Sequence, residues 1–227
     1  MGQRTVMARR TTIQEKYEFE NPFKADPLVR RALLYCSGER LLDLGCGEGA
    51  DSVFFARRGF TVTALEENRA YLKRLRSYIS DKGIKNVALV KHDATTYRYP
   101  RNRFDVISCI LVICCMKRSD FERMLPRVKR CVKPGGIIIM SSRNYLDPEL
   151  REYRTTQRAI EPNTYRKKED CCKFMYFIEK GRLRDLFSDF DVLYSYEGYA
   201  PCKYGEHPKH GDSYIICRRP SQNGSRR

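Results

Sequence analysis

The chain has 227 residues, and its 44 lysines and arginines outnumber its 28 aspartates and glutamates, which gives a formal net charge of +16 at pH 7. Hydrophobic residues make up 41% of the sequence, and 14 glycines and 10 prolines are too few for a collagen-like or wholly disordered chain. The longest nearly apolar run, residues 106–116, is well short of the roughly 20 residues that cross a bilayer. We therefore expect a folded protein without a membrane span, with nucleic acid or another polyanion as a standing hypothesis for its partner.

The first twenty residues lack the uninterrupted apolar segment of a secretory signal, so a cytoplasmic location is the expectation. In that setting the ten cysteines are expected to be reduced and mostly buried. The adjacent pairs Cys114–Cys115 and Cys171–Cys172 lack the spacing of zinc ligands, and no metal site is predicted. A few exposed thiols that bind a soft metal or metalloid are the alternative.

Hydrophobic periodicity predicts alternating helices and strands in the first two thirds of the chain. Helices are expected over residues 26–36, 52–58, 68–82 and about 121–132, and strands over 40–44, 60–65, 87–91, 104–112 and 137–141. A Pro134-Gly135-Gly136 breaker precedes the last of these strands. The alternation predicts an α/β fold with a doubly wound, parallel sheet between about residues 40 and 142.

The remainder of the chain is less regular. Residues 143–178 form a charged stretch that is interpreted as an insertion or lid, followed by a helix over 179–187 and strands over 191–196 and 213–217. Seven strands in all are expected, in a single domain over residues 1–218 that begins with an arm and helix (1–39). Residues 219–227 are expected to be a disordered basic tail.

A glycine-rich segment, Gly45-Cys46-Gly47-Glu48-Gly49, directly follows the first strand. Glycines there allow a ligand to approach the backbone at the carboxyl edge of the sheet, and Glu66 lies about 20 residues further on, where dinucleotide-binding folds place a ribose-binding acid. Asp43 and Glu48 would repel a bound pyrophosphate, whereas they would favour a ligand that carries an amine and a sulfonium.

These residues resemble the class I S-adenosylmethionine-dependent methyltransferases over about residues 40–142. The resemblance rests on Leu42 to Gly49, on Glu66 at the end of the second strand, on His92-Asp93-Ala94 after the third, on the fourth strand and on the Lys133-Pro134-Gly135-Gly136 turn. It implies a mostly parallel seven-stranded sheet and S-adenosylmethionine as cofactor. Five motifs in the family's order are more specific than one glycine motif.

The resemblance also assigns roles to individual residues. Gly45, Cys46, Gly47 and Gly49 would line the methionine moiety, Glu66 would hold both ribose hydroxyls, and Asp93, with Ala94 beside it, would accept a hydrogen bond from the adenine amino group. Cys109, Ile110 and Leu111 would flank the cofactor, and Asp43 and Glu67 complete the expected set of cofactor-binding residues.

Residues 45–68 are most similar to the tellurite-resistance-type, small-molecule branch of that family, so methyl transfer to a metabolite or metalloid is the leading expectation. The end of the fourth strand lacks the Asn/Asp-Pro-Pro-Tyr/Phe run of enzymes that methylate base amino groups. An RNA or protein methyltransferase that uses the basic stripe Arg123, Arg127 and Arg130 is the alternative, and a non-catalytic cofactor-binding module is a third.

Methyl transfer from a sulfonium needs mainly the alignment of an acceptor lone pair in a dry pocket, so catalytic residues are not identified from the sequence. His207 and His210 could deprotonate an acceptor, or they could be loop histidines on a solvated surface. The identity of the acceptor, the oligomeric state and the role of the cysteine pairs stay open.

Overall fold

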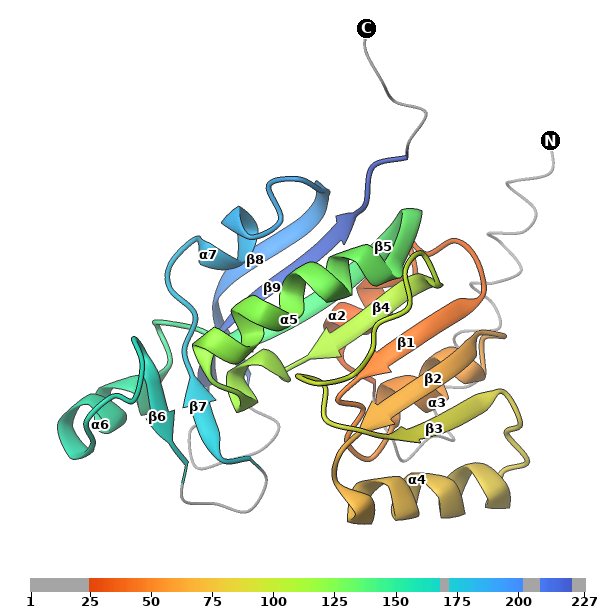
Figure 1. The fold of residues 1–227 in the computed structure, drawn as a ribbon, viewed down its shortest axis with the longest axis horizontal. Coiled ribbons are helices and arrows are strands. Elements are labelled where there is room, and N and C mark those ends of the chain that lie inside the picture. Colours follow the sequence, from red (N-terminus) through yellow and green to blue (C-terminus); the bar gives the residue numbers. More distant parts are fainter. Residues whose placement is uncertain (1–24, 168–171, 202–208, 222–227) are drawn as a thin grey trace, which may run out of the picture.

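The computed structural model describes residues 25–167, 172–201 and 209–221. In these ranges a seven-stranded sheet has the order β3-β2-β1-β4-β5-β9-β8 (Figure 1). Its strands are β1 (Arg40–Leu44), β2 (Thr61–Glu66), β3 (Val87–Lys91), β4 (Phe104–Ile110), β5 (Val132–Arg143), β8 (Asp191–Pro201) and β9 (Lys209–Arg218). The five strands from β1 to β5 are parallel, and β9 is antiparallel to both of its neighbours. The predicted mostly parallel, doubly wound sheet is confirmed.

Helices cover both faces of the sheet. On one face lie α2 (Pro27–Ala32), α3 (Ala50–Ala56) and α4 (Arg69–Asp81), and on the other lie α5 (Arg118–Cys131) and α7 (Arg182–Asp185) (Figure 1). Side chains of one strand alternate between the faces, so that Leu41 packs with the first group and Leu42 with the second. Both residues are fully buried, as expected for a parallel sheet with two covered faces.

The strand order reverses at β1, which lies between β2 and β4. At such a switch point the connections on the two sides lead to opposite faces of the sheet, so a crevice opens beyond the carboxyl ends of the strands. The glycine-rich segment after β1 is therefore located where open α/β sheets bind their ligands.

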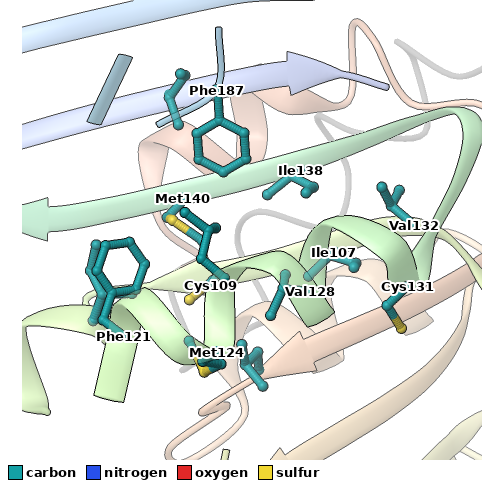
Figure 2. Packing of buried hydrophobic residues seen from close by; sticks show 14 of the residues in the cluster. Ile107, Cys109, Phe121, Met124, Val128, Cys131, Val132, Ile138, Met140 and Phe187 are labelled. Carbon is teal, nitrogen blue, oxygen red and sulfur yellow. The ribbon is translucent and has the colours of Figure 1, made fainter. Parts of the chain in front are cut away.

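The helix α5 packs along the centre of one face (Figure 2). Phe121, Met124 and Val128 recur at helical spacing, are fully buried and lie against Ile107 of β4 and Ile138 of β5. The periodic apolar residues that predicted this helix are thus the ones that attach it to the sheet.

Several expected boundaries are wrong. β5 does not begin after the breaker but at Val132, and it continues through Pro134-Gly135-Gly136. A register shift against β4 between Phe104 and Val106 accommodates this segment. A Cβ atom on Gly136 would lie 2.7 Å from the carbonyl oxygen of Asp105, so this glycine allows a close approach of two strands rather than a turn.

Other elements differ mainly in length. The first helix ends at Ala32, and the helix expected over 179–187 is the single turn α7. Strand β8 continues to Pro201 and β9 already begins at Lys209, because the two strands pair with each other over this extra length. Residues 92–103, all of them described, connect β3 to β4 through turns instead of a helix.

The charged stretch after β5 contains α6 (Pro148–Thr156) and a two-stranded sheet of β6 (Thr164–Arg166) and β7 (Phe174–Tyr176). These elements lie beyond the carboxyl ends of β4 and β5, and β7 contacts the short 3-10 helix η1 (Ile113–Cys115) that follows β4 (Figure 1). Tyr165, Met175 and Phe177 form a small apolar cluster with Cys114 and Leu150.

The predicted arm before residue 25 lies outside the described residues, as do His207 and most of the predicted tail. Among the residues that the structure describes, no helix is both long enough and apolar enough to cross a membrane.

Replacement of Phe121 by alanine tests the packing of α5. The ring is fully buried, so Phe121→Ala should lower the free energy of unfolding by about 3–5 kcal/mol in urea titrations. Leu34 is 69% exposed, and Leu34→Ala should change the free energy of unfolding by less than about 0.5 kcal/mol. Equal effects of the two substitutions would contradict the packing described.

Candidate cofactor-binding site

A cavity of about 410 Å³ opens at the carboxyl ends of the parallel strands. Its lining includes Gly45 and Gly47 after β1, Glu66 and Glu67 at the end of β2, Asp93 and Ala94 after β3, and Ile110 and Leu111 at the end of β4. The volume is within the range of small-molecule and cofactor pockets. Eight residues that the sequence and its resemblance singled out are therefore brought together in one cavity.

The glycine segment presents its backbone to this cavity. Gly47 has a φ of +53°, and nothing lies within 4 Å of the position where its Cβ would be, so a ligand has room against this peptide. Gly45 has a φ of +66°, and a Cβ there would lie 2.5 Å from Val112 Cγ2. The first glycine thus allows contact with the segment after β4, and the second leaves space for a ligand.

Glu66 connects this segment to β2. Its Oε2 accepts a hydrogen bond from Gly47 N at 3.0 Å, and its Oε1 accepts one from Asn68 N at 2.8 Å. Each carboxylate oxygen can accept a further hydrogen bond. Glu66 can therefore hold the glycine segment in place and still bind a pair of ligand hydroxyls, and the first of these roles was not foreseen from the sequence.

Asp93 is fixed in a similar way by the turn that follows β3. Its Oδ1 accepts hydrogen bonds from Thr95 N at 2.7 Å and from Thr95 Oγ1 at 2.8 Å. These contacts orient the carboxylate at the cavity wall, as a contact to a ligand amino group requires.

Asp43, Cys46, Gly49 and Cys109, all within the described chain, lie outside the cavity lining. Gly49 is the N-cap of α3, where a Cβ would approach Leu75, and Cys46 N donates a hydrogen bond to Leu65 O at 3.0 Å. Both residues shape the loop. Cys109 is fully buried in the core under α5, near Met140 and Met124, and does not line the cavity (Figure 2).

The two acidic groups predicted beside the loop differ in environment. Glu48 is exposed and forms an ion pair with Arg74 of α4. Asp43 is 3% exposed beneath the loop and accepts a hydrogen bond from Ser52 Oγ at 2.6 Å. Burial beneath the loop raises the pKa of Asp43 to about 6, because the negative charge of its carboxylate is removed from water.

His210 is neither a solvated loop residue nor a group of the cavity. It lies buried in β9, with Nδ1 3.0 Å from Asp147 Oδ2. Asp147 also caps α6 by accepting a hydrogen bond from Glu149 N, and it accepts another from Gly211 N. Ligand atoms of Asp147, Glu149 and His210 lie within 4.8 Å of one another, but these contacts give the cluster a structural function, the attachment of α6 to β9.

The far wall of the cavity consists of residues that the sequence left without a role. Cys115 and Met116 come from η1 and the residue after it. Phe174 begins β7, and Cys172 and Lys173 are the two residues before it. The only indication of this wall in the sequence was the presence of two pairs of adjacent cysteines. The inserted stretch thus lines the same cavity as the glycine segment.

A second, shallower hollow of about 450 Å³ has a basic lining of Arg98, Arg101, Arg127 and Arg130 together with Tyr97 and Tyr99. We call this hollow the arginine groove. Of the predicted basic stripe, Arg127 and Arg130 line the groove, whereas Arg123 forms an ion pair with Asp120.

The geometry agrees with comparison to known proteins. Residues 41–136 match the family model described as a methyltransferase domain, in the part of the chain that supplies β1 to β5. The matched segment is similar to a methyltransferase domain, and the chain has the fold of solved S-adenosylmethionine-dependent methyltransferases. The methyltransferase family predicted from the motifs is confirmed.

The chain is similar to curated proteins over part of its length. It is 30% identical over 125 residues to the ubiquinone biosynthesis O-methyltransferase of Pseudomonas putida (strain GB-1), which is 55% of this chain and 52% of that protein. It is 29% identical over 126 residues to the protein of the same name from Saccharophagus degradans, with 55% and 51% covered. The chain spans about half the length of the curated relatives it matches.

Solved structures resemble the chain over nearly its whole length. TehB from Haemophilus influenzae superposes with a TM-score of 0.69 at 17% identity, covering 90% of this chain and 65% of that one. An S-adenosylmethionine-dependent methyltransferase from Methanosarcina mazei gives a TM-score of 0.69 at 18% identity, covering 88% and 100%. At this identity the likeness shows the fold.

Asp43→Asn tests the buried charge beneath the loop. The pKa of Asp43 is raised from its usual 3.8 to about 6, so between these pH values the folded chain holds a proton that the unfolded chain has lost. The wild type should lose stability relative to Asp43→Asn as pH rises from 4 to 6, by up to about 3 kcal/mol, with no further change above pH 7.

The asparagine can still accept the hydrogen bond from Ser52, so the variant should fold. Urea titrations of both proteins between pH 4 and 8 measure the difference. Parallel stability curves for the two proteins would contradict the assigned burial of this charge.

Proposed function

We propose that the chain transfers the methyl group of S-adenosylmethionine to a small-molecule acceptor. The observation that carries this proposal is that one cavity combines an open glycine backbone at Gly47, two oriented carboxylates at Glu66 and Asp93, and a wall from the inserted stretch. The first three features suit the cofactor, and the wall leaves a limited space for an acceptor.

The residues of the cavity fit the parts of the cofactor in order along the sheet edge. The Gly45 and Gly47 backbone would bind the methionine part, Glu66 the ribose hydroxyls and Asp93 the adenine amino group. When bound, the cofactor supplies a methyl group that its sulfonium already activates. Leu111, Val112, Met116 and Phe174 give this cavity apolar surface, which excludes water and confines the acceptor.

A small acceptor is favoured over a macromolecule because η1 and the start of β7 line the cavity on the side of the inserted stretch and so limit the space beside the glycine segment. The names of the similar proteins also support it, since the ubiquinone biosynthesis O-methyltransferases act in the synthesis of a small molecule. The cytoplasmic location expected from the sequence stays a prediction.

The arginine groove supports a second candidate, an RNA methyltransferase. Four arginines and two tyrosines in one hollow can contact phosphates and bases together. RNA binding there would weaken steeply as salt rises, whereas binding of a small neutral acceptor would change little.

Calorimetric titration with S-adenosylmethionine tests the cofactor site, and transfer of tritiated methyl to metabolite, metalloid and total RNA pools then identifies the acceptor class. Label in small molecules at a rate independent of salt is the expected result. Label in RNA that falls with salt would favour the second candidate. Binding without transfer to any pool would indicate a non-catalytic module, and absence of binding would refute the proposal.

Glu66→Ala should weaken the binding of S-adenosylmethionine by about 1.5–3 kcal/mol, the free energy lost with hydrogen bonds to a charged group. The neighbouring acid Glu48 lies outside the cavity lining, so Glu48→Ala is the matched control and should leave the affinity nearly unchanged. Both affinities are measured by calorimetry. Equal losses of affinity in the two variants would mean that these acids act by holding the glycine segment in place and not by binding the ribose hydroxyls.

A further inference from the structure

The arginine groove lies on the face of the sheet that α5 covers. One wall is the connection between β3 and β4, over residues 96–101, and the other is formed by Arg127 and Arg130 in the second half of α5. Tyr97 and Tyr99 of the first wall pack against the same apolar core as α5. Among the residues that the structure describes, none lines both this groove and the cavity at the glycine segment.

Hydrogen bonds attach the two walls of the groove to each other at both ends. Near the start of the connection, Arg127 Nη2 donates a hydrogen bond to Thr95 O. Near its end, Asn102 N donates one to Arg130 O at 2.9 Å, where the connection passes the last turn of α5 (Figure 1). The groove is therefore a formed hollow and not a gap between two independent segments.

Four arginines line the groove without a counter-charge: Arg98, Arg101, Arg127 and Arg130. As far as the chain is described, the lining contains no acidic side chain. None of the four arginines forms an ion pair with a carboxylate of residues 25–167, 172–201 or 209–221. Like charges that are held close together repel one another, so this hollow favours an anionic ligand.

The uncompensated charge of α5 is confined to the groove. The other basic residues of the helix, Arg118, Arg123 and Lys129, each form an ion pair with a carboxylate. Arg127 and Arg130 are the basic residues of α5 without such a partner in the described parts of the chain. A long polyanion would need free charge along more of the helix, so a compact ligand matches the groove better.

All the cations of the groove are guanidinium groups. A guanidinium can donate two parallel N–H groups to one phosphate, whereas a lysine ammonium acts as a point charge. Arg127 donates to the carbonyl oxygens of Arg123 and Thr95 and still has further N–H groups for a ligand, because a guanidinium carries five. The groove therefore suits a ligand with more than one phosphate.

Two tyrosine rings line the groove beside these charges. The ring centres of Tyr97 and Tyr99 are 5.1 Å apart, and the rings are nearly perpendicular, at 88°. Tyr99 OH donates a hydrogen bond to Ala94 O at 2.8 Å, and the guanidinium carbon of Arg127 lies 5.7 Å from the centre of the Tyr99 ring. Such fixed aromatic rings can stack with a nucleobase.

We propose that the arginine groove is a second ligand site of this chain and binds a nucleoside diphosphate or triphosphate. The site does not depend on the proposed function, because no methyl acceptor is involved. Tyr99 and Arg127 hold the carbonyl groups of Ala94 and Thr95, which line the cavity. The nucleotide would thus lie directly behind the turn in which Thr95 orients Asp93.

Guanosine diphosphate is the probe, because its base lacks the 6-amino group of adenine that Asp93 is proposed to bind. Calorimetric titration of the full chain should show one bound nucleotide. Arg101→Ala and Arg130→Ala should each weaken its binding by about tenfold, the scale for loss of hydrogen bonds to a charged group. Arg123 lies on the same helix but outside the groove, paired with Asp120, so Arg123→Ala is the matched control and should bind as the wild type does.

The three variants replace exposed side chains, so their midpoints in urea titrations should match that of the wild type. A lower affinity in Arg101→Ala and Arg130→Ala then reports on the groove and not on the fold.

A comparison of ligands tests the base and the phosphates separately on the unmodified chain. Pyrophosphate has the phosphates of guanosine diphosphate without its base, and it should bind at least about fivefold more weakly, the scale of one stacked base. Tyr97→Leu, which keeps an apolar side chain against the core, should reduce this difference. Equal affinity of the unmodified chain for the two ligands would overturn the assignment to a nucleotide.

Other results would also overturn the proposal. Displacement of guanosine diphosphate by S-adenosylmethionine would locate it in the cavity instead. Equal losses in Arg123→Ala and Arg130→Ala would show that only the overall charge attracts it. A ten-nucleotide single-stranded RNA that binds more tightly than the nucleotide, and loses affinity in Arg101→Ala, would assign the groove to the RNA candidate. A chain that binds S-adenosylmethionine but not guanosine diphosphate keeps the proposed function and loses this second site.

Discussion

The parallel pairing of β1 with β2, completed by the Glu66 carboxylate, is the constraint on which the cavity depends. The register places Leu44 opposite Leu65, so the glycine segment and Glu66 leave the sheet side by side. Hydrogen bonds from Gly47 N and Asn68 N to this carboxylate then fix the loop relative to the start of α4. Because the carboxylate is bound on both oxygens, its position is set before any ligand arrives, which limits the conformational entropy lost on binding.

The wall on the opposite side depends on a buried polar network rather than on sheet pairing. Arg143 at the end of β5 donates a hydrogen bond to Asp212 Oδ1 at 2.7 Å, and Tyr214 OH donates one to Asp212 Oδ2. Asp147 and His210 continue this network into α6. Buried charges are costly unless they are paired, so the network specifies one arrangement of the inserted stretch against β9. It also brings the Arg143 guanidinium close to Cys114.

The sheet and the side of the cavity lined by Gly45, Glu66 and Asp93 could be predicted from the sequence because both depend on local patterns. Apolar periodicity identifies α5. A glycine after a strand, or an acid at a strand end, can be recognised from the sequence of a single βα unit. Cys109 lies in the core and not in the cavity lining, and the sequence could not show this, because side chains of β4 alternate between the faces of the sheet and are apolar on both.

The side of the cavity lined by η1 and the start of β7 could not be predicted because it depends on contacts between distant segments. Cys115 and Cys172 line one cavity only because β7 packs on η1, and no periodicity in residues 143–178 indicates that contact. The burial of His210 is of the same kind, since its partner Asp147 precedes it by 63 residues. Irregular stretches follow few local sequence rules, and charged stretches show no apolar periodicity from which their packing could be predicted.

The two halves of the cavity come from separate stretches of the chain. Residues up to Ile110 supply the contacts suited to the cofactor, while most of the opposite wall comes from η1 and from the segment between β5 and β8. Such a division makes the fold modular in an evolutionary sense. Under the proposed function, replacement of the inserted segment by one of different length or composition would alter which acceptors fit without disturbing the residues proposed to bind the cofactor. A family built in this way can diversify its substrates while the sequence around the glycine loop changes little.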